Sequence, residues 1–345
     1  MLELLNTKIF DNERNILNAD LFVNNLKHTF KAFKFNTKIT YEVYRNITIY
    51  HITWNDDKSY EDMLELKKEI ALALGVTTNE FEIEKEKENE VKIKVQNMKK
   101  STLSLKELLE ESKDKDNNNI PLGLSEEDKV IYFNIEKDKQ LLFNYIKEKK
   151  ISFVYCAASV EFSNIILNIL MNKDKTKIII LDSQSINYNT YDKLCEVVNN
   201  EQEIINKIKE IRHIFEEKVK NNDQSRIILF IDEIYGIIKN DISVKDDINY
   251  LLEVGATMNI HIIMSTDSVL DEDINYLFDK DDISKLSFYL TTRREYNKFL
   301  DNYIDESLGR DGIYVSTNST LTRISLPLIE DDEITRVVDN LEVNI

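Results

Sequence analysis

Two spacings of apolar residues divide the first hundred positions of the chain into helices and strands. Apolar side chains recur every three or four positions at 16–33 and again at 59–75, which predicts two amphipathic helices. At 38–54 and 80–97 apolar and polar residues alternate instead, with a polar reversal inside each stretch, which is typical of paired strands. Together these elements predict a small α+β domain.

The remainder of the chain has a different pattern, in which short apolar runs are separated mostly by helical segments. Five such runs stand at 151–155, 177–181, 226–231, 259–264 and 285–290. Strands that are apolar throughout, rather than alternating, are buried on both faces, as in a parallel sheet with crossover helices. The longest crossover, at 196–220, spaces its apolar residues by three or four and predicts a helix packed on that sheet.

A polar stretch separates the two patterns. Residues 111–119 contain no apolar side chain and are charged or turn-forming, as in a connection between modules. We therefore predict an α+β domain at 1–112, a linker at 113–121 and an α/β domain at 122–345.

Composition narrows the class of protein. The chain has 345 residues, of which 42% are apolar, so it can bury a large core. No apolar run approaches the roughly 18 residues that a membrane-spanning helix needs. Met1 begins no signal sequence, which predicts a cytoplasmic protein without a membrane segment. Cys156 and Cys195 are too few for a disulfide framework and lack partners at zinc-ligand spacing, so we expect buried thiols.

The negative net charge limits where the chain can bind DNA. Against 45 basic residues stand 63 acidic ones, giving a net charge of −18, which repels a phosphate backbone over most of the surface. Any contact with DNA must therefore be local. The sharpest basic pair in the α/β half is Arg293 and Arg294, which we interpret either as a solvated surface pair or as a phosphate contact.

The most informative motif is RIILFIDEIYG at 226–236, where an apolar strand ends in two adjacent carboxylates, Asp232 and Glu233. In P-loop ATPases the aspartate at this place holds the hydration shell of Mg²⁺, and a following glutamate can draw a proton from the attacking water. An acidic pair at a strand end can also merely cap the chain or face solvent. In the next apolar run, His261 has no histidine or cysteine at ligand spacing, so we expect it in the core rather than at a metal.

Several segments of the α/β half resemble, in order, the motor domain of the FtsK/SpoIIIE DNA translocases. They are IIILDSQ at 178–184, FIDEIYGII at 230–238, GATMNIHIIMST at 255–266, SLGRDGIY at 307–314 and EDDEITRVVDNL at 330–341. The N-terminal elements are similar to the α+β domain that precedes this motor. The resemblance implies a RecA-like P-loop NTPase fold, ATP and Mg²⁺ as cofactors, double-stranded DNA as partner and a homo-oligomeric ring. It also implies Walker B roles for Asp232 and Glu233 and a sensor role for Thr266.

The phosphate-binding stretch departs from the family pattern. A P-loop, G-x-x-x-x-G-K-[ST], wraps phosphates with the backbone N–H groups of glycines and neutralises them with a lysine. The equivalent stretch is CAASVEFS at 156–163, which supplies Cys156, Ala158, Ser159, Glu161, Phe162 and Ser163. Glu161 replaces a glycine and Phe162 replaces the lysine, so Coulomb repulsion works against binding ATP. Only the hydroxyl of Ser163 remains, and Ser163 and Asp232 are the Mg²⁺ ligands implied if ATP binds.

A second departure lies near the C-terminus. Asn297 falls near the position where the family carries an arginine that reaches across a subunit boundary. Charge-stabilising groups are therefore missing from more than one place.

Three functions are compatible with this combination. The first is a DNA-transfer or segregation protein with a degenerate Walker A motif, acting as a pseudo-ATPase or accessory subunit, either as a homo-oligomer or with an intact motor. The second is an active double-stranded DNA translocase in which a lysine from elsewhere replaces the missing one. The third is a protein-interaction scaffold, like the related motor domains of type VII secretion. The sequence identifies no DNA-contacting residue.

Overall fold

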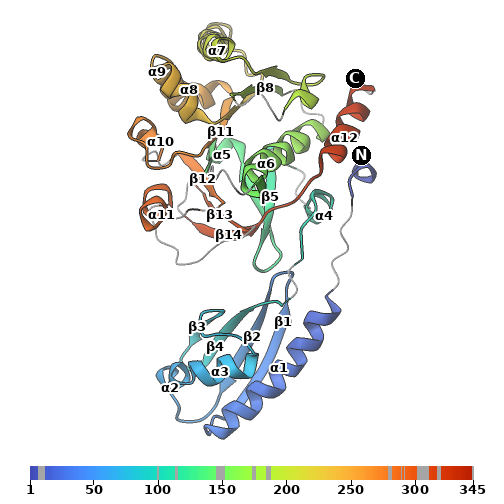
Figure 1. The fold of residues 1–345 in the computed structure, drawn as a ribbon, viewed down its shortest axis with the longest axis vertical. Coiled ribbons are helices and arrows are strands. Elements are labelled where there is room, and N and C mark those ends of the chain that lie inside the picture. The colour runs from blue at the N-terminus through green and yellow to red at the C-terminus, as the bar shows by residue number, and fades with distance from the viewer. Residues whose placement is uncertain are drawn as a thin grey trace. The chain divides into compact units, whose positions relative to one another are not determined.

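The computed structural model describes residues 1–6, 12–98, 101–112, 116–144, 152–172, 176–183, 188–278, 282–288, 290, 292–300, 311–316 and 320–343. Of these, residues 152–159 and 311 are described by their backbone alone. The chain divides into two compact units (Figure 1). The smaller comprises Lys8–Thr102 and Glu126–Lys129, and the larger comprises Met1–Thr7, Leu103–Ser125 and Val130–Ile345.

This division differs from the predicted boundary at 112. Helix α4 (Leu105–Glu111) belongs to the larger unit, because Leu105 shares an apolar core with Ile120 of strand β5 (Asn119–Ser125). The polar stretch predicted as a linker at 113–121 therefore has the larger unit on both sides. A lack of apolar residues could not indicate which elements this stretch joins, and its last three residues, 119–121, belong to β5.

The smaller unit is an antiparallel sheet covered by helices, in the strand order β1-β2-β4-β3. Its elements are α1 (Glu13–Ala32), β1 (Thr37–Val43), β2 (Ile47–Trp54), α2 (Tyr60–Glu65), α3 (Lys67–Leu74), β3 (Phe81–Lys87) and β4 (Glu90–Gln96). Phe30, Ile52, Ile70 and Ile93 are completely buried in the core between the sheet and the helices. The predicted α+β architecture is confirmed, although the second predicted helix is divided into α2 and α3 at Leu66.

The larger unit is built on one ten-stranded sheet, in the order β6-β5-β14-β13-β12-β7-β11-β10-β8-β9. Strands β12, β7, β11, β10, β8 and β9 run parallel to their neighbours in that order, and the other strands pair antiparallel. The remaining strands are β6 (Val130–Asn134), β7 (Gln140–Asn144), β8 (Lys177–Asp182), β9 (Glu196–Val198), β10 (Ile227–Asp232), β11 (Ile260–Thr266), β12 (Ile283–Ser287), β13 (Asp311–Val315) and β14 (Leu321–Ser325).

Helices cover both faces of this sheet. Alternate residues of β10 enter different cores: Leu229 packs with the helices α7 to α11, and Phe230 packs with α6 and α12. The bounds are α5 (Ile135–Asp138), α6 (Ser152–Met171), α7 (Glu201–Asn221), α8 (Ile234–Asn240), α9 (Val244–Val254), α10 (Asn275–Phe278), α11 (Arg293–Leu300) and α12 (Asp331–Val343). Short 3-10 turns are η1 (Leu2–Leu4), η2 (Asn189–Tyr191), η3 (Gly255–Met258) and η4 (Glu272–Ile274). The predicted parallel sheet with crossover helices is confirmed.

One predicted strand is wrong. The apolar run 151–155 was expected to form a strand, but from Ser152 onward its backbone belongs to α6. The strand that precedes α6 is β7, with the sequence QLLFN, and all five of its residues are buried. A short apolar run has no period that distinguishes a strand from a buried helix, which is why the two were confused.

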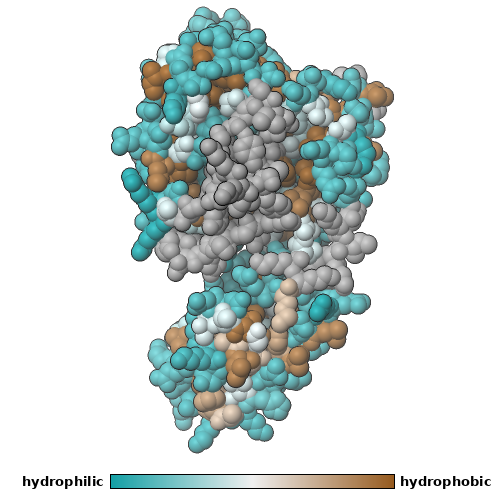
Figure 2. Space-filling model, in the orientation of Figure 1, coloured by the Kyte–Doolittle hydropathy of each residue, from teal (hydrophilic) through white to brown (hydrophobic). Residues whose placement is uncertain are grey.

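The visible surface of the larger unit is mostly hydrophilic. Where described residues are visible, Figure 2 shows mostly hydrophilic side chains on the larger unit, as expected for a chain with a net charge of −18. Among the helices of the described residues, none has both the length and the apolar character needed to cross a membrane.

Candidate functional site

Polar side chains gather where the parallel strands end. Register places Asp232 of β10 beside Asp182 of β8, and Thr266 of β11 beside Asn144 of β7. Each of these residues is the last of its strand. Ligands of open α/β sheets bind outside the carboxyl ends of the strands. The fold thus brings Asp232, Glu233 and Thr266, which the sequence singled out, to one edge of the sheet.

The two adjacent carboxylates at this edge are buried. Asp232 and Glu233 are 6% and 4% exposed. The Ser265 hydroxyl donates to Oδ1 of Asp232 at 2.7 Å and accepts from the Glu233 N–H at 2.9 Å. The Ser183 hydroxyl donates to the Asp232 carbonyl at 2.8 Å. The pair therefore does not face solvent, although Glu233 stands at the N-cap position of α8.

Glu233 also has an unusual backbone. Its φ is 61° and its ψ is 68°, the left-handed region that non-glycine residues rarely adopt. The Asp267 N–H donates to Oε2 of Glu233 at 3.0 Å, so the turn after β11 holds the carboxylate in place. Strained residues that are fixed in this way concentrate at functional sites. Neither Ser265 nor Asp267 was predicted to hold the acidic pair, and no sequence motif points to them.

The predicted phosphate-binding residues lie elsewhere, inside helix α6. Phe162 is completely buried, and its ring centroid lies 5.1 Å from that of Phe143, 5.5 Å from that of Phe230 and 6.2 Å from that of Tyr188. Ser163 is also buried, at 4% exposure. These side chains pack against the sheet, as residues of a core helix do. The side chains of Cys156, Ala158 and Ser159 lie outside the described residues, although their backbone belongs to α6.

Glu161 is a buried acid on the same helix. It is 1% exposed, and Oε2 accepts a hydrogen bond at 3.1 Å from the Asn164 amide, which also donates to the Pro327 carbonyl. Burial raises the pKa of Glu161 to about 8, and the hydrogen bond from Asn164 opposes this shift. Glu161 is therefore mostly neutral at pH 7 and does not present a negative charge to a ligand.

His261 and Cys195 are core residues, as predicted. His261 is 1% exposed, and Nδ1 lies 3.1 Å from the Lys139 carbonyl. Burial lowers the pKa of His261 to about 4 and raises the pKa of Cys195 to about 12. Within the described part of the chain, no group of three or more histidine, cysteine, aspartate or glutamate residues is arranged to hold a metal ion.

Solved structures share this architecture. Neither a family profile nor a curated protein sequence matches the chain. The conjugation coupling protein TcpA of pCW3, in a monomer form with ATPγS, superposes with a TM-score of 0.59 at 11% identity, over 92% of this chain and 99% of that one. The cytoplasmic domain of the Thermomonospora curvata type VII secretion ATPase EccC gives 0.55 at 15% identity, over 82% of this chain and 34% of that one. EccC ATPases 2 and 3 in complex with a signal sequence peptide give 0.52 at 14% identity, over 82% and 52%.

The chain shares the RecA-like α/β fold of these structures, as predicted. The chain spans about a third to a half of the EccC structures, and nearly all of the TcpA structure. At these identities the likeness concerns the fold.

The stretch predicted as the phosphate-binding turn, 156–163, is helical in the structure. In P-loop folds this turn joins a strand directly to the helix that follows. Here the strand is β7 and the helix is α6, and the connection between them, 145–151, lies outside the described residues. In sequence this connection holds three lysines and no glycine. The turn was expected at 156–163 because the apolar run 151–155 was taken as the strand before it. The strand that precedes α6 is β7, which was not predicted.

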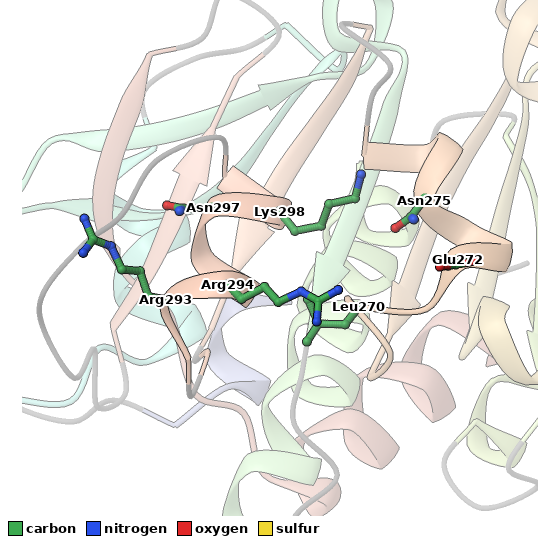
Figure 3. Close-up of a pocket in the computed structure, with 7 residues that line it drawn as sticks. All are labelled: Leu270, Glu272, Asn275, Arg293, Arg294, Asn297 and Lys298. Atoms are coloured by element: carbon green, nitrogen blue, oxygen red, sulfur yellow. The ribbon is translucent and has the colours of Figure 1, made fainter.

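A second group of predicted residues meets at a cavity of about 670 Å³. Arg293, Arg294, Asn297 and Lys298 of α11 line it, and Arg294 and Lys298 extend toward its other wall (Figure 3). Asn297 thus lies beside the arginine pair that the sequence singled out. This cavity has a cationic character, in contrast to the acidic edge of the sheet.

Proposed function

We propose that the chain is a motor-family protein of DNA transfer or segregation whose own nucleotide site is degenerate. Its Walker B-like pair, Asp232 and Glu233, carries the proposal, because both carboxylates are buried and oriented at the edge where a motor of this fold handles nucleotide. TcpA, a conjugation coupling protein whose structure was solved with ATPγS, shares this architecture. On this proposal the protein acts on double-stranded DNA as a homo-oligomer or beside an intact motor.

The degenerate site is supported by what a phosphate cradle needs. Backbone N–H groups wrap phosphates closely where glycines remove steric conflict. Neither 145–151 nor 156–163 contains a glycine, and the chain has only 6 glycines. The acidic edge without a glycine-built cradle predicts weak or absent ATP binding and no independent turnover.

A nucleotide titration tests this proposal. Purified protein is titrated with ATP by calorimetry, with and without Mg²⁺, and we expect an affinity weaker than about 1 mM in both cases. The matched control is Asp232→Ala, which leaves a weak signal unchanged if that signal is nonspecific. Tight, Mg²⁺-dependent binding that disappears in Asp232→Ala would overturn the degenerate site.

An active double-stranded DNA translocase is the second candidate. The preserved Walker B-like pair and Thr266 at the end of β11 favour it, since a motor that has lost all chemistry has no need of a strained, hydrogen-bonded Glu233. DNA-stimulated ATP turnover that vanishes in Glu233→Gln supports this candidate. Turnover that is flat with DNA, or equal in Glu233→Gln, rejects it.

A protein-interaction scaffold is the third candidate. It is favoured by the net charge of −18 and by the likeness to EccC, whose ATPases were solved with a signal sequence peptide. Duplex affinity at low and physiological salt discriminates, because electrostatic DNA binding weakens steeply with salt, whereas docking of a protein partner need not. Salt-independent association with no duplex affinity favours the scaffold.

A further inference from the structure

The cavity beside α11 is divided between two unlike walls. Figure 3 shows Arg294 and Lys298 extending on the side of α11 that faces Leu270, Glu272 and Asn275. These three residues come from the segment around η4 and the start of α10. The volume of about 670 Å³ is within the range of sites that enclose a small molecule or a few side chains of a peptide.

Two of the three cations of the first wall, Arg293 and Arg294, are placed where a helix disfavours them, whereas Lys298 lies in its last turn. Arg293 and Arg294 are the first two residues of α11, where the partial positive charge of the free backbone N–H groups favours anions. The helix cannot rotate to relieve this, because Tyr296 and Phe299 fix its opposite face in the core. Glu295 accepts from the Thr292 N–H at 2.7 Å and so caps the helix. A negatively charged ligand is therefore favoured on the outer face.

The second wall favours a peptide over a nucleic acid as the anionic ligand. Glu272 lines the cavity and is flanked in sequence by Asp271 and Asp273, while Leu270 adds an apolar surface that is 37% exposed. A nucleic acid carries phosphate at every step and meets repulsion from these carboxylates. A peptide can carry acidic, apolar and basic side chains in turn, and so can match both walls at once.

We propose that this cavity binds an acidic peptide segment of a partner protein. Two carboxylates of the segment pair with Arg294 and Lys298, and an apolar or basic residue meets Leu270 or Glu272. Arg294 and Lys298 are four residues apart on α11, about 6 Å along its axis. Alternate residues of an extended peptide are about 6.6 Å apart, so glutamates at i and i+2 fit this spacing.

Fluorescence polarisation of a labelled peptide tests the proposal on the full chain. The probe is fluorescein-Ala-Glu-Ala-Glu-Ala-Leu-Lys-Ala, compared with the same peptide in which both glutamates are glutamine. We expect the acidic probe to bind at least about ten-fold more tightly, because charge-assisted hydrogen bonds to arginine and lysine are lost in the glutamine version. We expect Arg294→Glu to reduce the affinity for the acidic probe by a similar factor.

The control variant is Lys209→Glu, which makes the same charge reversal for an exposed lysine on α7, outside the cavity. It should leave the affinity unchanged within about two-fold, and thermal unfolding should show both variants folded. Equal binding of the two peptides, or equal loss in both variants, overturns the proposal. A labelled duplex of 20 base pairs that binds more tightly than the acidic probe and is released by Arg294→Glu overturns it in favour of nucleic acid.

Discussion

The acidic edge of the sheet and the α11 cavity differ in two respects: the sign of their ionisable side chains and how far those side chains are buried. At the edge, Asp232 and Glu233 are buried and hydrogen-bonded to the neighbouring strand and turn. In the cavity, Arg294 is exposed and Lys298 is half-buried, both on long side chains. Buried, hydrogen-bonded charges are costly to disturb, whereas exposed ones contribute little to stability. Substitutions behind or at the edge should therefore lower the stability of the fold, and those in the cavity should change binding with only a small effect on stability.

Phe162→Lys should cause the largest loss of stability, because Phe162 is buried beneath the acidic edge. Phe162 packs against Phe143 and Phe230, from two of the strands that end at the acidic edge. A lysine there buries a charge among aromatic rings, so we expect a loss of more than about 4 kcal/mol in the free energy of unfolding, measured by urea denaturation. Phe162→Leu keeps the site apolar and should lose only about 1–3 kcal/mol.

The same variant distinguishes the two placements of the phosphate-binding turn. If position 162 were the Walker A position, Phe162→Lys would restore the lysine of the motif, although not its glycines, and should increase Mg²⁺-dependent ATP binding. A folded variant that gains ATP affinity would return CAASVEFS to the phosphate site and contradict its position within α6.

Glu161 predicts a pH dependence on the same helix. The folded-state pKa is about 8 and the model-compound value is 4.5, so between these values the folded chain binds a proton that the unfolded chain has released. Stability from this group is therefore complete below pH 4.5 and is lost as pH rises toward 8, by up to about 1.4 kcal/mol per pH unit. Urea denaturation from pH 5 to 8 should show this slope reduced in Glu161→Gln. An unchanged slope would mean that Glu161 is ionised in the fold.

Ser265→Ala measures how firmly the acidic edge is held. The variant removes the donor to Asp232 and the acceptor for the Glu233 N–H, both buried, so we expect a loss of about 1–3 kcal/mol in the free energy of unfolding. A double-mutant cycle with Asp232→Ala, which removes the accepting oxygen, isolates the first contact, since two variants that share one hydrogen bond are not additive. Additive losses would show that the serine and the aspartate do not interact.

The α+β module and the parallel part of the large sheet could be predicted from hydrophobic spacing, and Gly75 ends α3 at a φ of 66° as a C-terminal glycine should. Six strands of the large sheet were not predicted: β5, β6, β7, β9, β13 and β14. The five residues of β7 have no period, and the run at 151–155 that follows them is also apolar. That local ambiguity moved the expected phosphate-binding turn into α6.

Only the part of the candidate site that lies at the end of a single strand could be predicted from the sequence. Asp232 and Glu233 follow one another in sequence, so a single motif located them. Their partners Ser265 and Asp267 come from another strand and the turn after it, and only strand order brings them close. The cavity beside α11 likewise joins residues from separate elements, so Arg293 and Arg294 alone could not distinguish a solvated pair from a binding surface.

Arg294→Glu should have the smallest effect on folding and completes the comparison. Arg294 is exposed at the second position of α11, where the helix N-terminus favours acids over bases. We expect the free energy of unfolding to rise by about 0.3–1 kcal/mol, and the gain to shrink at high salt because exposed charges are screened. A loss above about 2 kcal/mol would mean that Arg294 holds the fold together, as Ser265 does at the edge, and the contrast between a fixed acidic edge and an adaptable cationic cavity would fail.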